Sequence, residues 1–294
     1  MLSKLAAGHF RLWPWQARVD AHAVRAAREA VVHLKPAVVI TGGSSGIGLA
    51  LARRFLEAGR NTVIVARDGP RLTEAAAALQ ASTGVEVATI TCDITEPNAS
   101  EVIAAGLAQA GLYLDVLVNN AAIGLAGPFV THTQNDISRL ISLNVESLTR
   151  LTRAALPDMI ARQRGGLLNV ASLGAHVPGP NQAAYYASKS YVVSFTEAIA
   201  SEISGQAVRV SALLPGPVDS RFHEAMGAEA SLYRLILSSI SPARVAKSGY
   251  RGFILGQRII VPGVFNTLIF IVLRFLPHTL TVPIVYWLLR RPQN

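Results

Sequence analysis

Residues 37–59 read AVVITGGSSGIGLALARRFLEAG, an apolar run followed directly by a glycine-rich turn and by residues at helical spacing. The run has the composition of a buried strand, and the apolar residues after the turn repeat as on one face of a helix. Gly42 and Gly46 allow a tight turn, and Gly48 allows close packing of helix on strand. A plain strand-to-helix turn is the alternative, but this order predicts a parallel α/β unit whose helix N-terminus suits an anion.

Short apolar runs alternate with longer segments at helical spacing through the rest of the chain. The runs predict strands at 37–41, 62–66, 85–91, 116–119, 166–171, 208–214 and 258–261. The segments between them predict helices at 47–58, 69–81, 98–110, 133–163, 183–203 and 242–256. This alternation is typical of a Rossmann-like, doubly wound parallel sheet with helices on both faces. We expect an extension over 1–35, this α/β domain over 36–263 and a helical tail over 264–294.

The composition narrows the class of protein. Hydrophobic residues make up 51% of the 294 residues and charged residues 15%, which excludes a disordered chain. The net charge of +9 suits an anionic partner, but the basic residues concentrate in apolar terminal segments, so we expect no nucleic acid. Cys92 is the single cysteine and the N-terminus lacks a secretory pattern, which together predict a cytoplasmic location.

Two polar positions follow the second and third predicted strands. Arg67 stands where a site for NAD carries an acidic residue, and its guanidinium suits the 2′-phosphate of NADP, with Ser44 as an added donor. Arg67 therefore favours NADP(H), although a solvated surface arginine is the alternative and the adjacent Asp68 keeps NAD(H) open. Asp93 suits the adenine amino group or a helix cap equally well.

Several motifs occur together in the order of one known family: TGGSSGIG, NNAAIG, the asparagine of SLNV, Ser172, YYASK and PGPVDS. Over residues 35–263 the chain resembles the short-chain dehydrogenase/reductase family. Tyr185 and Lys189 are four residues apart, which places them on one helical face, and Ser172 precedes Tyr185 by 13 residues. Tyr186 shares that face too, but the 13-residue distance favours Tyr185.

The resemblance implies hydride transfer between NADP(H) and a carbonyl or alcohol, with Tyr185 as general acid and base. It also implies that Lys189 binds the nicotinamide ribose and stabilises the phenolate, that Ser172 holds the substrate oxygen, and that Asn144 holds a water. The predicted cofactor-binding residues are Gly42, Ser44, Ser45, Gly46, Ile47, Gly48, Arg67, Asp93, Ile94, Asn120, Ala121, Tyr185, Lys189, Pro215, Gly216 and Val218. Ala122 departs from the family pattern, which usually has glycine there.

Other functions have less support in the sequence. No histidine or cysteine spacing suits a metal, and Ser172 lies outside any hydrolase elbow. A catalytically silent nucleotide-binding regulatory or scaffold protein is the alternative, against which the intact set of Asn144, Ser172, Tyr185 and Lys189 argues.

The C-terminal tail is apolar over residues 264–289, and no acidic residue follows Glu229. Arg274, Pro277 and Pro283 interrupt it, so two short helices lying in a membrane interface fit better than one spanning helix. A lid or an oligomer-forming helix pair is the alternative, and a homo-oligomer, dimer or tetramer, is expected. The aromatic and basic residues of the N-terminal extension leave the same choice open. Membrane contact would favour a lipophilic substrate.

Overall fold

The computed structural model describes residues 19–228, 231–233 and 239–290. The aromatic residues of the N-terminal extension, Phe10, Trp13 and Trp15, lie outside this part of the chain. Within it, one parallel sheet has seven strands in the order β3-β2-β1-β4-β5-β6-β7. The strands are β1 (Lys35–Thr41), β2 (Asn61–Ala66), β3 (Ala88–Thr91), β4 (Leu112–Asn119), β5 (Gly166–Val170), β6 (Arg209–Leu213) and β7 (Ile259–Ile260). The predicted doubly wound α/β sheet is confirmed.

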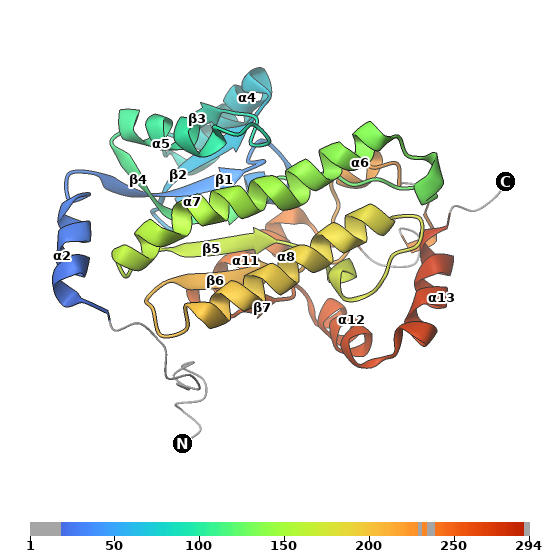
Figure 1. Cartoon of the computed structure of the whole chain (residues 1–294). Coiled ribbons are helices and arrows are strands. Elements are labelled where there is room, and N and C mark those ends of the chain that lie inside the picture. The colour runs from blue at the N-terminus through green and yellow to red at the C-terminus, as the bar shows by residue number, and fades with distance from the viewer. Residues whose placement is uncertain (1–18, 229–230, 234–238, 291–294) are drawn as a thin grey trace.

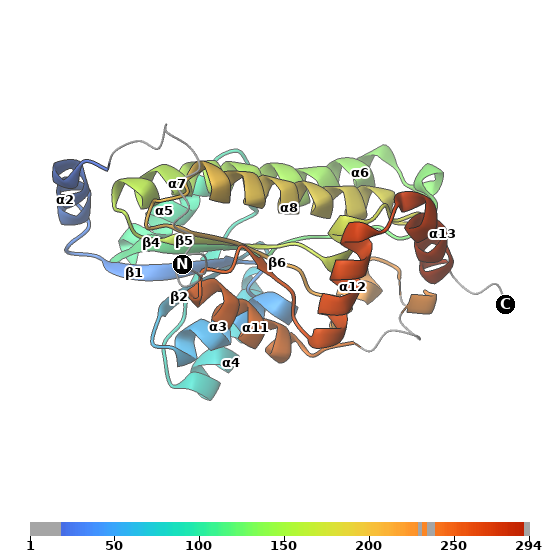
Figure 2. The same ribbon diagram turned by 90° about the horizontal axis from the view of Figure 1, so that it is seen from below.

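Helices cover both faces of the sheet (Figures 1 and 2). One face carries α5 (Ala99–Gln109), α7 (Leu148–Ala161) and α8 (Ala183–Glu202), and the other carries α3 (Gly46–Glu57), α4 (Gly69–Thr83) and α11 (Pro242–Ile254). Because neighbouring strand residues point to opposite faces, Val39 belongs to the first core and Val38 to the second. The strands are therefore apolar on both sides, which explains their continuous apolar runs.

The region predicted as one helix over 133–163 is divided. It contains α6 (Gln134–Ile141), a π-helical turn η2 (Ser142–Ser147) and then α7. The predicted third strand over 85–91 was also too long, because β3 begins at Ala88. Short π-helical insertions occur often at functional sites, and this one carries Asn144.

Further helices lie outside the predicted α/β pattern. An N-terminal helix, α2 (Ala21–Glu29), is tied to the end of α7 by a hydrogen bond from Arg28 Nε to the Arg162 carbonyl oxygen, 2.9 Å long. The tail forms the two expected helices, α12 (Val264–Phe275) and α13 (His278–Leu289), which meet at Pro277. Among the described residues, no helix combines the length and the apolar character needed to cross a bilayer.

Candidate active site

A large open cleft lies at the carboxyl ends of the strands, where the strand order reverses between β1 and β4. Its volume is about 1810 Å³. Of the predicted site residues, the cleft is lined by Gly42, Ser44, Ser45, Gly46, Ile47, Arg67, Asp93, Ile94, Asn120, Ala121, Ser172, Tyr185, Lys189, Pro215, Gly216 and Val218. Gly48 and Asn144 are buried behind its wall. The fold therefore gathers residues from most of the chain into one site.

The turn between β1 and α3 needs glycine at three positions. Gly42 and Gly46 have φ of 65° and 54°, in the left-handed region that favours glycine. A Cβ at Gly48 would lie 2.3 Å from the Gly42 carbonyl oxygen. The amide of Asn120 fixes the turn to β4 by donating to the carbonyl oxygens of Thr41 and Gly42, at 2.9 and 3.2 Å. This bare backbone, at the start of a twelve-residue helix, fits a pyrophosphate.

Replacing Gly48 by alanine tests this packing. We expect Gly48→Ala to lower the free energy of unfolding by about 2 kcal/mol or more, because the new methyl group meets backbone that cannot move aside. Urea denaturation measures the change. Gly69→Ala is the matched control: its Cβ would lie 3.4 Å from the nearest atom, so a similar loss there would contradict the explanation.

The end of the cleft beyond β2 is strongly basic. Arg67 follows β2 and is exposed, and the further arginines that line the cleft include Arg53, Arg71 and Arg139, which come from α3, α4 and α6. Sequence reasoning singled out Arg67 only, because nothing in the chain order brings the other three to it. The carboxylate of Asp68 accepts a hydrogen bond of 3.1 Å from the Arg71 backbone N–H and caps α4. Asp68 thus has a structural use at the helix start.

Asp93 lies in the same part of the cleft. Partial burial alone would raise the pKa of its carboxyl group, but hydrogen bonds from the hydroxyl and backbone N–H of Thr95 and the charges of Arg67 and Arg139 outweigh it and lower that pKa. The carboxylate therefore stays ionised. It is placed to accept a hydrogen bond from a ligand while it stabilises the turn after β3.

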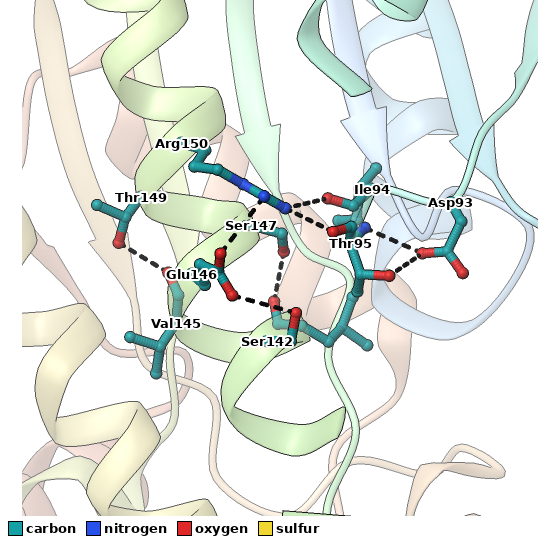
Figure 3. A network of polar contacts seen from close by, with 10 residues as sticks. Asp93, Ile94, Thr95, Ser142, Val145, Glu146, Ser147, Thr149 and Arg150 are labelled. Atoms are coloured by element: carbon teal, nitrogen blue, oxygen red, sulfur yellow. Dashed lines mark hydrogen bonds and ion pairs between the residues drawn. The ribbon is translucent and has the colours of Figure 1, made fainter. Parts of the chain in front are cut away.

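Arg150 of α7 holds this turn from the other side (Figure 3). Its guanidinium donates to the carbonyl oxygen of Thr95 at 2.7 Å and pairs with Glu146 at 3.4 Å. We expect Arg150→Met to weaken the binding of a nicotinamide nucleotide, the ligand that the sequence predicts, several-fold, about 1 kcal/mol, because the turn that carries Asp93 loses its fixed position. Fluorescence titration measures the dissociation constant. Arg153→Met, at an exposed position on the same helix, is the control and should bind as the parent does.

The opposite end of the cleft holds the side chains suited to proton transfer. Tyr185 and Lys189 both come from α8, and the Lys189 ammonium lies 5.9 Å from the centre of the Tyr185 ring. Lys189 is buried and donates to the Val170 carbonyl oxygen at 2.9 Å. Burial lowers the pKa of Lys189 to about 8. Burial raises the pKa of the Tyr185 phenol, the Ser172 hydroxyl lowers it as a hydrogen-bonding neighbour, and Tyr233 raises it. The phenol therefore holds its proton at neutral pH.

Tyr186 also lines the cleft but has different surroundings. Its ring covers the backbone of Gly174 and Gly179, where added Cβ atoms would lie 2.7 and 2.3 Å from the ring. Burial raises the pKa of its phenol as well, and no hydrogen bond from Ser172 opposes that rise. Of the two tyrosines, Tyr185 is the one with both Ser172 and Lys189 beside it.

Asn144 is buried behind the cleft wall and supports the site through hydrogen bonds. Its side-chain amide is bonded through both atoms: the oxygen accepts from the Ile123 backbone N–H at 2.9 Å, and the nitrogen donates to the Ile123 carbonyl oxygen at 2.8 Å and to Ser188 Oγ at 3.1 Å. Ser188 in turn donates to the Tyr185 carbonyl oxygen at 2.7 Å. The side chain of Asn144 thus connects the loop after β4 to the helix that carries Tyr185, which makes it a positioning residue.

The tail forms a wall of the site, in line with the lid that the sequence left open as an alternative, although no tail residue was among the predicted site residues. Ile269 and Leu273 of α12 and Val285 and Leu288 of α13 line the cleft. The helix α12 also reaches the PGPV segment, since a Cβ at Gly216 would lie 2.6 Å from the side-chain oxygen of Asn266. Periodicity could show that these helices were apolar, but not that they return to the cleft.

Comparison with known proteins adds a family and several relatives. Residues 36–231 match the sequence model of the family described as short chain dehydrogenase. A short chain dehydrogenase from Pseudocercospora fijiensis is 38% identical over 184 residues, which cover 62% of this chain and 59% of that protein. The very-long-chain 3-oxoacyl-CoA reductase of Bos taurus is 33% identical over 181 residues, 60% of this chain and 57% of that protein. The matches thus span under two thirds of either relative.

A solved structure is similar over more of the chain. It is a short-chain dehydrogenase from Sphingobium yanoikuyae in complex with NADPH, with a TM-score of 0.70 and 30% sequence identity. The match covers 78% of this chain and 88% of that protein.

Proposed function

Because the chain belongs to the short-chain dehydrogenase/reductase family and is an oxidoreductase, we propose that it reduces a ketone or aldehyde with NADPH, using Tyr185 as the acid. The observation that carries the proposal is the meeting of Ser172, Tyr185 and Lys189 in the same cleft as the bare glycine turn. A hydride donor bound along the turn and a carbonyl beside Tyr185 would share this space.

The chemistry follows from the side chains. The bound nicotinamide supplies the hydride that reduces the carbonyl carbon. Charge then develops on the carbonyl oxygen, and the Tyr185 phenol, protonated at neutral pH, is the group that can neutralise it. The Ser172 hydroxyl hydrogen-bonds the same oxygen and holds it in position. Lys189, charged below about pH 8, stabilises the phenolate that remains.

The charge state of Lys189 gives a pH dependence. Since burial lowers the pKa of Lys189 to about 8, the ammonium is charged below that pH and loses its proton above it. We expect kcat/KM for reduction to fall about tenfold per pH unit above the pKa, measured between about pH 6 and pH 10. Lys189→Arg, checked for folding by its melting temperature, should react more slowly but lack this fall. An unchanged rate up to pH 10 in the parent would contradict the role.

For the cofactor, we favour NADP(H) over NAD(H). Arg67 stands at the end of β2 with Arg53 and Arg71 lining the same end of the cleft, and paired guanidinium hydrogen bonds suit a 2′-phosphate. Asp68, the residue that kept NAD(H) open, caps α4 instead. The similar structure from Sphingobium yanoikuyae holds NADPH.

The substrate proposal rests on the cleft wall. The tail helices make one side of the cleft apolar, which favours a carbonyl compound with an apolar part. The similar protein of Bos taurus is a reductase of very-long-chain 3-oxoacyl-CoA by its name.

The remaining expectations also stand as proposals. They are the division at residues 35 and 263, a homo-oligomer, a cytoplasmic location and peripheral membrane contact through the termini.

Two measurements test the function. The intrinsic fluorescence of the protein should be quenched on titration with NADPH at lower concentrations than with NADH. A panel of ketones and aldehydes should then oxidise NADPH, followed by its absorbance. Failure to bind either nucleotide would exclude the proposal, and binding without turnover of any carbonyl would reduce it to nucleotide binding.

A further inference from the structure

The hairpin of α12 and α13 lies at one end of the molecule (Figures 1 and 2). Its solvent-facing side is apolar. Phe265, Leu268 and Phe275 of α12 and Leu280, Ile284 and Trp287 of α13 are all exposed, Phe275 by 79%. We call these six residues the hairpin surface. At 100° per residue, the three residues of α12 share one side of that helix, and the three residues of α13 share one side of theirs, so they are not scattered singly.

The hairpin surface is not needed to hold the hairpin in place, because other side chains do that. Phe270 packs edge-on against His176, with 4.8 Å between the ring centres, and Asn266 lies over Gly216. On α13, Val285 and Leu289 are buried in the core cluster beside Tyr185. Both helices therefore have apolar residues on their outer as well as their inner sides. An apolar patch of this kind on a folded protein marks an interaction site.

The charges around the surface indicate its partner. Arg290 lies beside it, with its guanidinium 5.7 Å from the centre of the Trp287 ring. Arg274 is also exposed, and its guanidinium lies 5.9 Å from Phe270, the ring that anchors α12 to His176. No acidic residue follows Glu229 in the sequence. A two-fold contact between two copies would bring these cations together, whereas the headgroups of an anionic bilayer would neutralise them. Each helix has twelve residues, too short to cross a bilayer but sufficient to lie in its surface.

The surface adjoins the mouth of the active-site cleft. Val272, Leu276 and Ile284 line the cleft and are also exposed, at 51%, 40% and 57%. From them the apolar wall continues inward through Leu273 and Val285, towards Tyr185. A molecule with a long apolar chain could therefore pass from a bilayer beneath the hairpin into the cleft while its chain stays in apolar surroundings.

We propose that the hairpin surface sits on an anionic lipid bilayer and that the cleft receives from it a carbonyl substrate with a long apolar chain. The second half of this proposal rests on the proposed reductase function, and the first half does not.

Vesicle flotation tests the first half. The full chain should float with vesicles of phosphatidylcholine and phosphatidylserine, bind less to phosphatidylcholine alone, and bind less at high salt. The double variant Phe265→Ser with Phe275→Ser should bind at least about tenfold more weakly. Val32→Ser with Leu255→Ser is the matched control, because both side chains are highly exposed and lie just before β1 and β7, at the opposite end of the strands from the cleft. Melting temperatures verify that both variants fold.

Some outcomes would overturn the proposal. The full chain could remain in the buffer with both kinds of vesicle, or the control pair could lose as much binding as the phenylalanine pair. Sedimentation could also show an oligomer that the phenylalanine pair dissociates, which would assign the surface to a second copy.

Kinetics test the second half. The phenylalanine pair should reduce a short, water-soluble ketone at the parent rate, because neither residue lines the cleft. It should reduce a long-chain ketone dissolved in the anionic vesicles about tenfold more slowly than the parent. Equal rates on the vesicle substrate would overturn delivery from the bilayer. Flotation without reduction of any carbonyl would instead refute the reductase function and leave the membrane surface standing.

Discussion

Tyr185→Phe is expected to reduce the rate of carbonyl reduction roughly a thousandfold while the dissociation constant of NADPH stays within about twofold of the parent value. The substitution removes only the hydroxyl that gives up the proton, and the ring keeps its packing against Phe222, 5.6 Å away between ring centres. Single-turnover kinetics with NADPH and fluorescence titration separate the two effects.

Tyr186→Phe is the matched control. It removes the same group from the next residue, whose ring packs over Gly174 and Gly179. It should retain most of the activity. If the two variants exchanged behaviour, Tyr186 would be the acid, and the arrangement of Ser172 and Lys189 around Tyr185 would need another explanation.

Arg67→Asp is expected to weaken NADPH binding by about a hundredfold or more and to bring NADH binding level with it or above it. The variant loses a cation beside the 2′-phosphate and adds a carboxylate that repels the phosphate but can accept from the two ribose hydroxyls of NADH. The lowered pKa of Asp93 should also rise, because Arg67 is one of the charges that lower it. Parallel titrations with both nucleotides measure the change.

Arg60→Asp controls for net charge. Arg60 immediately precedes β2, whereas Arg67 immediately follows it, so the variant makes the same change in charge away from the cleft. It should bind both nucleotides as the parent does. A similar loss of NADPH affinity in both variants would indicate a long-range effect of net charge and would exclude a direct contact from Arg67.

The sheet was predictable because its strands are buried on both faces. Runs such as Val38, Val39 and Ile40 are apolar at every position and are therefore easy to recognise as strands. The glycine turn after β1 indicates where the strand ends and where the next helix begins. Residues of the site that follow a strand directly, such as Arg67 and Asp93, were visible for the same reason, since parallel strands end at one edge.

Features that depend on contacts between distant segments were not predictable. The η2 turn interrupts a region whose apolar spacing continues through it, and its clearest contact, from Asn144 to the loop after β4, lies 21 residues away in sequence. In the sequence, Arg53 and Arg139 look like ordinary exposed residues of predicted helices. Only the fold shows that both line the cleft. The tail was recognised as two apolar helices, but its role as a wall depends on tertiary packing.

The close packing of Asn266 of α12 against Gly216 means that a shortened form of the protein would also change the cleft. Removal of everything after Gly263 would take away that side chain, and with it the apolar partners of Met226 and Tyr233 in the core cluster beside Tyr185. Such a truncation would open one side of the cleft and also remove the outward-facing Phe265 and Phe275. Point substitutions at Phe265 and Phe275 are expected to separate the proposed membrane attachment from catalysis, whereas deletion would impair both at once.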